Sequence, residues 1–335
     1  MAITIRDVAE AAGVSTATVS RALRGLPNVD EATRARVQAI AAQLDYVISP
    51  SASRLASGRT GSVGVITPYI SRWFFSTVLS GVENVLQSAG MDLLLMSVST
   101  PDAQHRLPPA PRLRRRVDGV LAIALPPDDP QLDDVIALGM PTSLIGTAKE
   151  GVPGVTIDDV QAGRTATQHL LNLGHRRIAI ISGNLIDAPF TAEHDRFRGY
   201  RETMEEAGLE IDPLMEAFGY FTVAGGEQAM TALLTHRERP TAVFAMSDEM
   251  AFGAMRAMRS HGLTPGKDIS IIGIDNHDLS ELLDLTTVAQ PVFDLGRVAA
   301  EALLVQIRAG NGAVRPDSFV LPTQLIVRGS TSPVE

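Results

Sequence analysis

Residues 4–25 read "TIRDVAEAAGVSTATVSRALRG". Their apolar residues recur at the i, i+3, i+4, i+7 spacing of an amphipathic helix, in two runs separated by a glycine. The first run consists of Ile5, Val8, Ala9 and Ala12. Thr4 and Asp7 stand at the spacing of a capping box before it, and Gly13 is a typical C-terminal stop. The stretch therefore predicts two short helices joined by a tight turn.

The second of these helices has two different faces. Ser15 is placed to cap it, and its apolar stripe consists of Val19, Ala22 and Leu23. The opposite stripe carries small, hydroxylated and basic side chains, namely Ala17, Ser20, Arg21 and Arg24. One face is thus suited to packing, and the other offers hydrogen-bonding and positively charged groups outward.

A third helix is predicted after Asp30, with Val37, Ile40, Ala41 and Leu44 at the same spacing. Three such helices make a helix-turn-helix unit, whose second helix enters the DNA major groove by its N-terminal end. Thr16 and Ala17 are small enough for close approach, and the Arg21 guanidinium suits a guanine edge. From this pattern alone, a generic three-helix bundle with a solvated arginine face is an equal alternative.

The charge of the chain is uneven. Residues 1–60 hold seven Arg, no Lys and five acidic residues, a net charge of +2, whereas the 335-residue chain carries −9 and the remainder therefore −11. A basic head on an acidic body suggests that only the head meets a polyanion. The chain has no cysteine, which excludes disulfides, a thiol nucleophile and a cysteine-ligated zinc.

The stretch 48–65, "ISPSASRLASGRTGSVGV", predicts a short hinge helix. Ser49 before Pro50 is a favoured helix start, and Gly58 is a stop. About two helical turns are marginal in isolation, and Leu55 is the only large apolar residue among them. The pattern favours a helix that forms conditionally, with a plain linker as the alternative.

Three segments, "TIRDVAEAAGVSTATVSRALRG", "VDEATRARVQAIAAQLDY" and "RLASGRTGSVGVI", resemble the lactose-repressor (LacI) family of bacterial transcription regulators. The resemblance is dense over residues 4–66 and looser beyond. It implies a head that binds DNA as a dimer and a hinge leucine, here Leu55, that wedges into the minor groove and bends the operator. The residues expected to contact DNA are Thr4, Ser15, Thr16, Ala17, Thr18, Ser20, Arg21, Arg24 and Leu55.

From residue 62 onward, strand-sized apolar runs alternate with helical patterns. Strands are predicted in "SVGVITP", "DLLLMSV", "DGVLAIAL", "TSLIG", "RRIAIISG", "TAVFAM" and "DISIIGI". Such alternation predicts parallel sheets covered on both faces. The resemblance implies a two-lobed α/β body of the periplasmic-binding-protein type after an all-α head and hinge helix.

The expected domains are a helix-turn-helix domain at 1–48, a hinge at 49–60 and an effector-binding and dimerisation domain at 61–335. Within the last, lobe one is expected at 62–160 plus 291–320, and lobe two at 161–290 plus 321–330. One stretch departs from the family: "PDAQHRLPPAPRLRRRVDG" contains Pro108, Pro109 and Pro111, which are incompatible with an unbroken helix. Local irregularity is therefore expected near 101–112.

Enzyme signatures are absent from the sequence. It contains no dinucleotide or P-loop glycine motif, no H-E-x-x-H and no G-x-S-x-G, and its seven histidines are scattered. We expect neither catalysis nor a cofactor nor a metal. No apolar run has the length of a signal peptide or a membrane span, so cytoplasmic location is expected.

Ligands of such two-lobed folds bind between the lobes, near the carboxyl ends of strands. The residues expected to bind the effector are Phe74, Phe75, Arg196, Phe221, Ser247 and Asp275. Phe74 can stack on a sugar or purine face, whereas Phe75 also fits a purely core role. The resemblance falls on Arg196 and Asp275 as the groups that hold effector hydroxyls, and Ser247 stands where sugar-binding relatives often have Asn.

These observations predict a homodimeric repressor that binds a palindromic operator and is controlled by a small polar effector, most simply a sugar or a sugar derivative. The alternative is a cytoplasmic ligand-binding module whose N-terminal helices contact a protein. Phosphate neutralisation makes DNA binding steeply salt-dependent, which separates the two.

Overall fold

The chain, seen as a computed structural model that describes residues 3–46, 59–98, 110–183, 191–310 and 317–334, forms two compact units. The first unit is Met1–Gly61 and the second is Ser62–Glu335. Each unit has its own core.

The first unit consists of α1 (Ile5–Ala12), α2 (Thr16–Leu23) and α3 (Glu31–Gln43). The caps predicted from the sequence are confirmed. The backbone N–H and hydroxyl of Thr4 donate to the Asp7 carboxylate at 2.7 and 2.8 Å, and Gly13 ends α1 with a left-handed φ of 65°. The Ser15 hydroxyl accepts from the Thr18 N–H at 3.1 Å. The shared core consists of Val8, Ala9, Ala12, Val19, Ala22, Val37 and Ala41.

Residues 47–58 lie outside the described residues. The hinge helix and Leu55 therefore remain predictions from the sequence.

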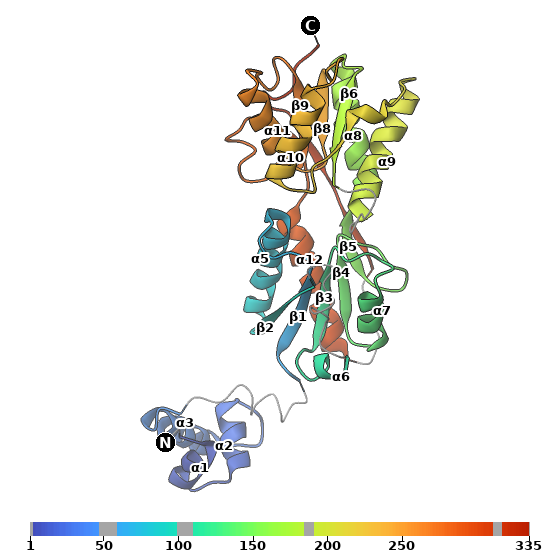
Figure 1. Ribbon diagram of the computed structural model, residues 1–335. Helices are drawn as coiled ribbons and strands as arrows, with labels where there is room; N and C mark the ends of the chain where they lie inside the picture. The colour runs from blue at the N-terminus through green and yellow to red at the C-terminus, as the bar shows by residue number, and fades with distance from the viewer. Residues whose placement is uncertain (1–2, 47–58, 99–109, 184–190, 311–316, 335) are drawn as a thin grey trace. The chain divides into compact units, whose positions relative to one another are not determined.

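Lobe one of the second unit is built on a parallel six-stranded sheet with the order β11-β5-β4-β3-β1-β2 (Figure 1). Its strands are β1 (Ser62–Thr67), β2 (Asp92–Ser97), β3 (Gly119–Ile123), β4 (Thr142–Ile145), β5 (Gly154–Ile157) and β11 (Phe319–Leu321). Its helices are α5 (Trp73–Ser88), α6 (Ala110–Leu113), α7 (Pro130–Ala137) and α12 (Val292–Ala309). α5 packs on α12, which lies against β3, β4 and β5.

Lobe two repeats this plan with a six-stranded sheet of order β12-β10-β9-β8-β6-β7. All its pairings are parallel except β10 with β12. Its strands are β6 (Ile178–Ser182), β7 (Glu216–Phe218), β8 (Ala242–Ala245), β9 (Ser270–Asp275), β10 (Thr286–Ala289) and β12 (Gln324–Ile326). Its helices are α8 (Asp159–Asn172), α9 (Thr191–Glu206), the 3₁₀ turn η1 (Pro213–Met215), α10 (Val223–Leu234) and α11 (Asp248–Ser260). α8 and α11 both pack on β8 and β9, with α9 against α8 and α10 against α11.

The two-lobed α/β fold predicted for the body is confirmed. Every strand predicted from the sequence is present, and the described strands pass from sheet one to sheet two, back, and forward again. Figure 1 shows the two lobes end to end, with α5 and α12 of lobe one reaching toward lobe two.

One expectation about the proline-rich stretch needs correction. Pro111 lies within a helix, the four-residue α6. A proline is tolerated there because the N–H groups of a helical first turn have no intrahelical acceptor to lose. Pro108 and Pro109 lie outside the described residues.

Candidate functional site

The outward surface of the first unit is carried by α2. Among the residues expected to contact DNA, Thr4, Ser15, Thr16, Ala17 and Arg21 are exposed, and Thr18, Ser20 and Arg24 are partly exposed. None of these eight side chains is buried, so all can meet a partner. Val19 and Ala22 of the same helix are buried in the core.

Arg34 fixes the C-terminal end of α2, a role that the sequence pattern did not indicate. Its guanidinium donates to the carbonyls of Ala22 at 3.1 Å and Leu26 at 2.9 Å. A cation that satisfies free carbonyls at a helix C-terminus also complements the helix dipole. The α2 helix is thus held by its hydroxyl cap at one end and by α3 at the other.

The second unit contains a cavity to which both lobes contribute. All six residues expected to bind the effector line it: Phe74, Phe75, Arg196, Phe221, Ser247 and Asp275. They are spread over about two hundred positions of sequence and five elements or loops, so only the fold brings them together. Ile157, Leu295 and Ala124 complete an apolar wall.

Phe75 has both of the roles considered from the sequence. It is 5% exposed and belongs to the main core, and its ring also borders the cavity. Phe74 is partly exposed, and its ring meets Phe75 edge to face at 5.2 Å between centroids. Phe74 therefore presents the more accessible aromatic surface of the two.

Arg196 is a buried cation held by two fixed acceptors. Its Nε donates to Asp159 Oδ1 at 2.8 Å, and its Nη1 donates to the Met246 carbonyl at 2.6 Å. Burial by itself lowers the pKa of the guanidinium, but Asp159, Asp275 and Asp248 outweigh this effect and raise that pKa. A solvated helical arginine, the alternative reading of this position, is therefore excluded.

Two glycines bring Asp159 and Arg196 together. A Cβ at Gly163 of α8 would lie 2.3 Å from the Arg196 carbonyl oxygen, and a Cβ at Gly199 of α9 would lie 2.2 Å from the Val160 carbonyl oxygen. The backbones of α8 and α9 therefore touch where the ion pair crosses between them. This contact aims both charged groups at the cavity.

Asp275 ends β9 at the cavity wall and accepts from Gln290 Nε2 at 2.5 Å. The residue is 6% exposed. Burial, opposed by Arg196 and assisted by Asp248, raises the pKa of Asp275 to about 8. An incoming hydroxyl that donates to the carboxylate would favour the ionised form.

Ser247 has a structural role in addition to lining the cavity. It is the N-cap of α11, and its hydroxyl accepts from the Met250 N–H at 3.3 Å. Phe221, on the loop before α10, has a left-handed φ of 52°. Both residues border the cavity from lobe two.

Four polar residues of the cavity wall were missed by sequence reasoning: Arg72, Asp159, Glu249 and Gln290. Each directly precedes a helix, lies in the first turn of one or follows a strand, at the edge where the carboxyl ends of the strands lie. Burial raises the pKa of Glu249, and Arg72 opposes that shift from the other lobe. The cavity thus holds two cations and three acidic groups, which fits a polar ligand without a large net charge.

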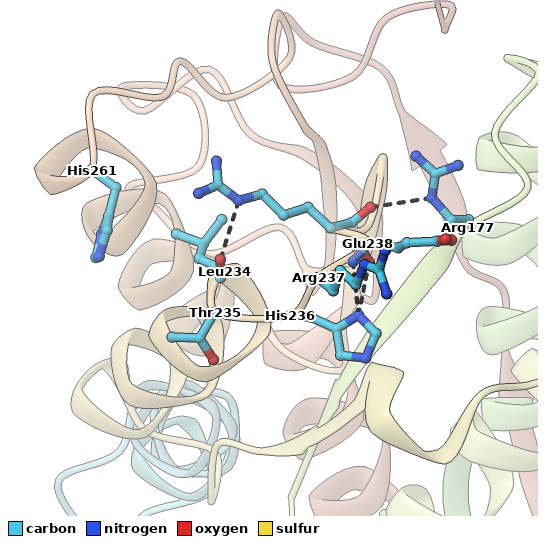
Figure 2. Close-up of a pocket in the computed structure, with 8 residues that line it drawn as sticks. Arg177, Leu234, Thr235, His236, Arg237, Glu238 and His261 are labelled. Carbon is cyan, nitrogen blue, oxygen red and sulfur yellow. Dashed lines mark hydrogen bonds between the residues drawn. The ribbon is translucent and has the colours of Figure 1, made fainter.

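Lobe two also has an open surface hollow at the amino ends of β6 and β8, lined by Arg177, Leu234, Thr235, His236, Arg237, Glu238, Arg239 and His261 (Figure 2). Two of its residues serve helix ends: Arg239 Nε donates to the Leu234 carbonyl at 3.1 Å, where α10 stops, and His261 Nδ1 lies 2.8 Å from the Ala257 carbonyl in the last turn of α11. Arg177 Nε donates to the Arg239 carbonyl at 3.2 Å. Capping of two helix C-termini thus accounts for Arg239 and His261.

No group of three or more metal-ligating side chains occurs among the residues that the structure describes. Within the same residues, no helix is both long and apolar enough to cross a membrane.

Comparisons with known proteins agree with this geometry. Residues 4–49 match the family model "Bacterial regulatory proteins, lacI family", and residues 167–331 match "Periplasmic binding protein-like domain". The chain is 34% identical over 342 residues to the HTH-type transcriptional regulator DegA of Bacillus subtilis, covering 100% of this chain and 99% of that one. It is 35% identical over 334 residues to the HTH-type transcriptional repressor CytR of Escherichia coli, covering 98% of this chain and 96% of that one.

Three solved structures have the same fold. The lac repressor dimer bound to operator and the anti-inducer ONPF matches with a TM-score of 0.88 at 27% identity, over 99% of this chain and 100% of that one. A complex of the regulator CelR with cellobiose matches with a TM-score of 0.69 at 33% identity, over 98% and 100% of the two chains. A LacI family regulator from Enterococcus faecium with bound ribose matches with a TM-score of 0.72 at 31% identity, over 82% and 100%.

Proposed function

This chain belongs to the LacI family of DNA-binding transcription regulators, which are not enzymes, and on that basis we propose that it is a cytoplasmic homodimeric repressor of a palindromic operator, controlled by a sugar or a sugar derivative. The observation that carries the effector part is the convergence of all six residues predicted from the sequence on one cavity. The operator part rests on the exposed, basic and hydroxylated face of α2.

On the DNA side, the N-terminal end of α2 supplies the reading surface. Thr16 and Ala17 allow close approach, and Arg21 extends from the same exposed face. In this proposal, Arg21 contacts a guanine edge. The other side chains contact the DNA backbone and the groove and so position the helix: Thr4, Ser15, Thr18, Ser20 and Arg24. Leu55 would then wedge into the minor groove, as its place in the hinge predicts.

On the effector side, donors and acceptors stand opposite aromatic surface. Arg196 offers donors only, and Asp275 offers acceptors only once a bound hydroxyl has favoured its ionised form, so together they suit a ligand with several hydroxyls. Phe74 and Phe221 give it an apolar face from either lobe. The relatives crystallised with cellobiose and ribose support a sugar.

Dimerisation is supported by an exposed apolar surface on lobe two. Tyr220 and Val223, at the start of α10, are 52% and 39% exposed, and Leu279 and Leu282, after β9, are 45% and 79% exposed. Both segments adjoin α11, which packs on α10 and places Phe252 against His277. We assign this surface to a second copy of the chain. The matched lac repressor structure is itself a dimer, which supports a homodimer.

The test has two arms on the full chain. Selection from random duplex DNA should yield a palindromic site, whose binding weakens steeply as salt rises. Thermal denaturation with a panel of monosaccharides, disaccharides and nucleosides, including cellobiose and ribose, should show one class that raises the melting temperature. Failure to select any DNA would favour the protein-contacting alternative, and stabilisation by no member of the panel would overturn the sugar assignment.

A further inference from the structure

We infer that Trp73 is a positioning residue of the effector cavity, because it holds the loop that follows Asp275 in lobe two against lobe one through His277 and Asp278. The inference rests on the proposed function only where it treats Asp275 as an effector ligand. The contact itself is a property of the described structure.

Trp73 is the only tryptophan of the chain and the first residue of α5 in lobe one. Its indole ring lies on the His277 imidazole of lobe two, with ring centroids 4.7 Å apart and planes at 31°. Its Nε1 donates to Asp278 Oδ2 at 3.2 Å. One aromatic side chain therefore makes a ring contact and a hydrogen bond to the opposite lobe, each of which adds to the attraction between the lobes.

The contact stands directly beside the cavity on both sides. In lobe one, Arg72 and Phe74 line the cavity while Trp73 between them meets the other lobe. In lobe two, Asp275 lines the cavity, and His277 and Asp278 follow two and three residues later. Any shift of Trp73 relative to His277 therefore moves cavity residues of both lobes against each other.

Hydrogen bonds tie this loop to the rest of lobe two. The Asp248 carboxylate accepts from the His277 N–H at 2.9 Å, the Ser280 hydroxyl at 2.6 Å and the Thr287 hydroxyl at 2.7 Å. Arg328 Nη2 donates to Asn276 Oδ1 at 2.9 Å. The residue pair that reaches Trp73 is thus fixed to the body of lobe two by a buried polar network.

The imidazole is also fixed in orientation. His277 Nδ1 accepts from the Leu279 N–H at 2.9 Å, and Phe252 meets the ring edge to face at 5.2 Å. The ring therefore offers Trp73 a surface held from behind by α11. A small side chain at position 277 would remove that surface without touching the cavity wall.

The absence of cysteine permits a direct measurement of lobe separation. Ala137 on α7 and Ala207 after α9 are exposed, one in each lobe, and their replacement by cysteine accepts a pair of nitroxide labels. Double electron–electron resonance on the full labelled chain, diluted into excess unlabelled chain, reports the intrachain distance without any effector. The result is therefore independent of whether the sugar proposal holds.

We expect Trp73→Ala and His277→Ala to broaden the distance distribution and to lower the ratio of the short-distance to the long-distance population at least about fivefold. Trp73→Phe, which keeps a ring but loses the N–H, should fall between these variants and the wild type. Ile70→Ala is the matched control, since Ile70 is 48% exposed, lies three residues before Trp73 and makes no hydrogen bond or ring contact within the part of the chain that the structure describes.

His277→Ala keeps Trp73 and provides a second reading should Trp73→Ala fail to fold. Its tryptophan fluorescence should become more accessible to acrylamide than that of the wild type, while its far-ultraviolet circular dichroism stays unchanged. Wild-type distances together with wild-type quenching in folded His277→Ala would overturn the inference.

Discussion

The head and the body of this chain place their functional side chains in opposite environments. In the head, Arg21 is exposed on a short helix whose other face makes the core. In the body, Arg196 is 5% exposed and already bonded to Asp159 and the Met246 carbonyl. Removal of an exposed arginine costs only the contact with its binding partner. Removal of a buried arginine also leaves a second buried charge unpaired, which destabilises the fold. The two regions should therefore respond differently to the same substitution.

The largest effect is expected for Arg196→Ala. Removing the guanidinium leaves the buried Asp159 carboxyl without its ion-pair partner, so the free energy of unfolding of the body should fall by about 3–5 kcal/mol. Arg164→Ala is the matched control on the same pair of helices, because Arg164 of α8 binds Glu202 and Glu206 of α9 in a partly exposed ion pair. Urea denaturation should show a much smaller loss for this variant, and equal losses would abolish the distinction.

A smaller effect is expected for Arg21→Ala in the head. Affinity for the selected operator should fall by about 1–3 kcal/mol and preference at one base pair per half-site should relax, while unfolding is little changed. Arg237→Ala is the control, since Arg237 is equally exposed but lies in the surface hollow of lobe two. Fluorescence anisotropy on operator and random duplexes checks this, and an equal loss on both duplexes would reduce Arg21 to a phosphate contact.

The smallest effect is expected from the ionisation of Asp275. Because burial raises its folded pKa to about 8, the folded body holds a proton that the unfolded chain releases, and stability falls as pH rises toward that value. Burial also lowers the pKa values of His175 and of the half-buried His169 and His277, so these groups change stability with pH mainly below the ordinary pKa of histidine. Between about pH 7 and pH 8 the loss should be at most about 1 kcal/mol.

Asp275→Asn should flatten that dependence in urea denaturation across the same pH interval. A slope as steep in Asp275→Asn as in the wild type would mean that another group carries the proton. Asp159 and Asp248 are the alternatives, because burial raises their pKa values too.

The head was predictable because its information is local. Thr4 with Asp7, Ser15 and Asp30 cap helices through atoms three residues away, which a sequence displays directly. The Arg34 clamp on Ala22 and Leu26 was not predictable, because it joins positions eight and twelve residues apart around a turn whose geometry the pattern leaves undefined.

In the body, seven strands were predictable from apolar runs, but β5, β7, β10, β11 and β12 were not, since these three- or four-residue strands do not stand out as separate apolar runs between turn signals. The six cavity residues came from strand ends and from the family resemblance. Asp159 and Gln290 were not predicted, because their roles depend on residues distant in sequence. The packing of α8 on α9 brings Asp159 to Arg196, 37 residues away, and the pairing of β9 with β10 brings Gln290 to Asp275, 15 residues away.

The central claim is that occupancy of the body's cavity sets the DNA affinity of the head. The most direct measurement is operator binding titrated with the sugar found to stabilise the chain, in the wild type and in Asp275→Ala. We predict that Asp275→Ala binds operator normally without sugar but needs at least about tenfold more sugar for the same response, roughly 1.4 kcal/mol. The factor by which sugar changes operator affinity should equal the factor by which operator changes sugar affinity. A wild-type sugar response in Asp275→Ala, or unequal factors in the wild type, would contradict the account.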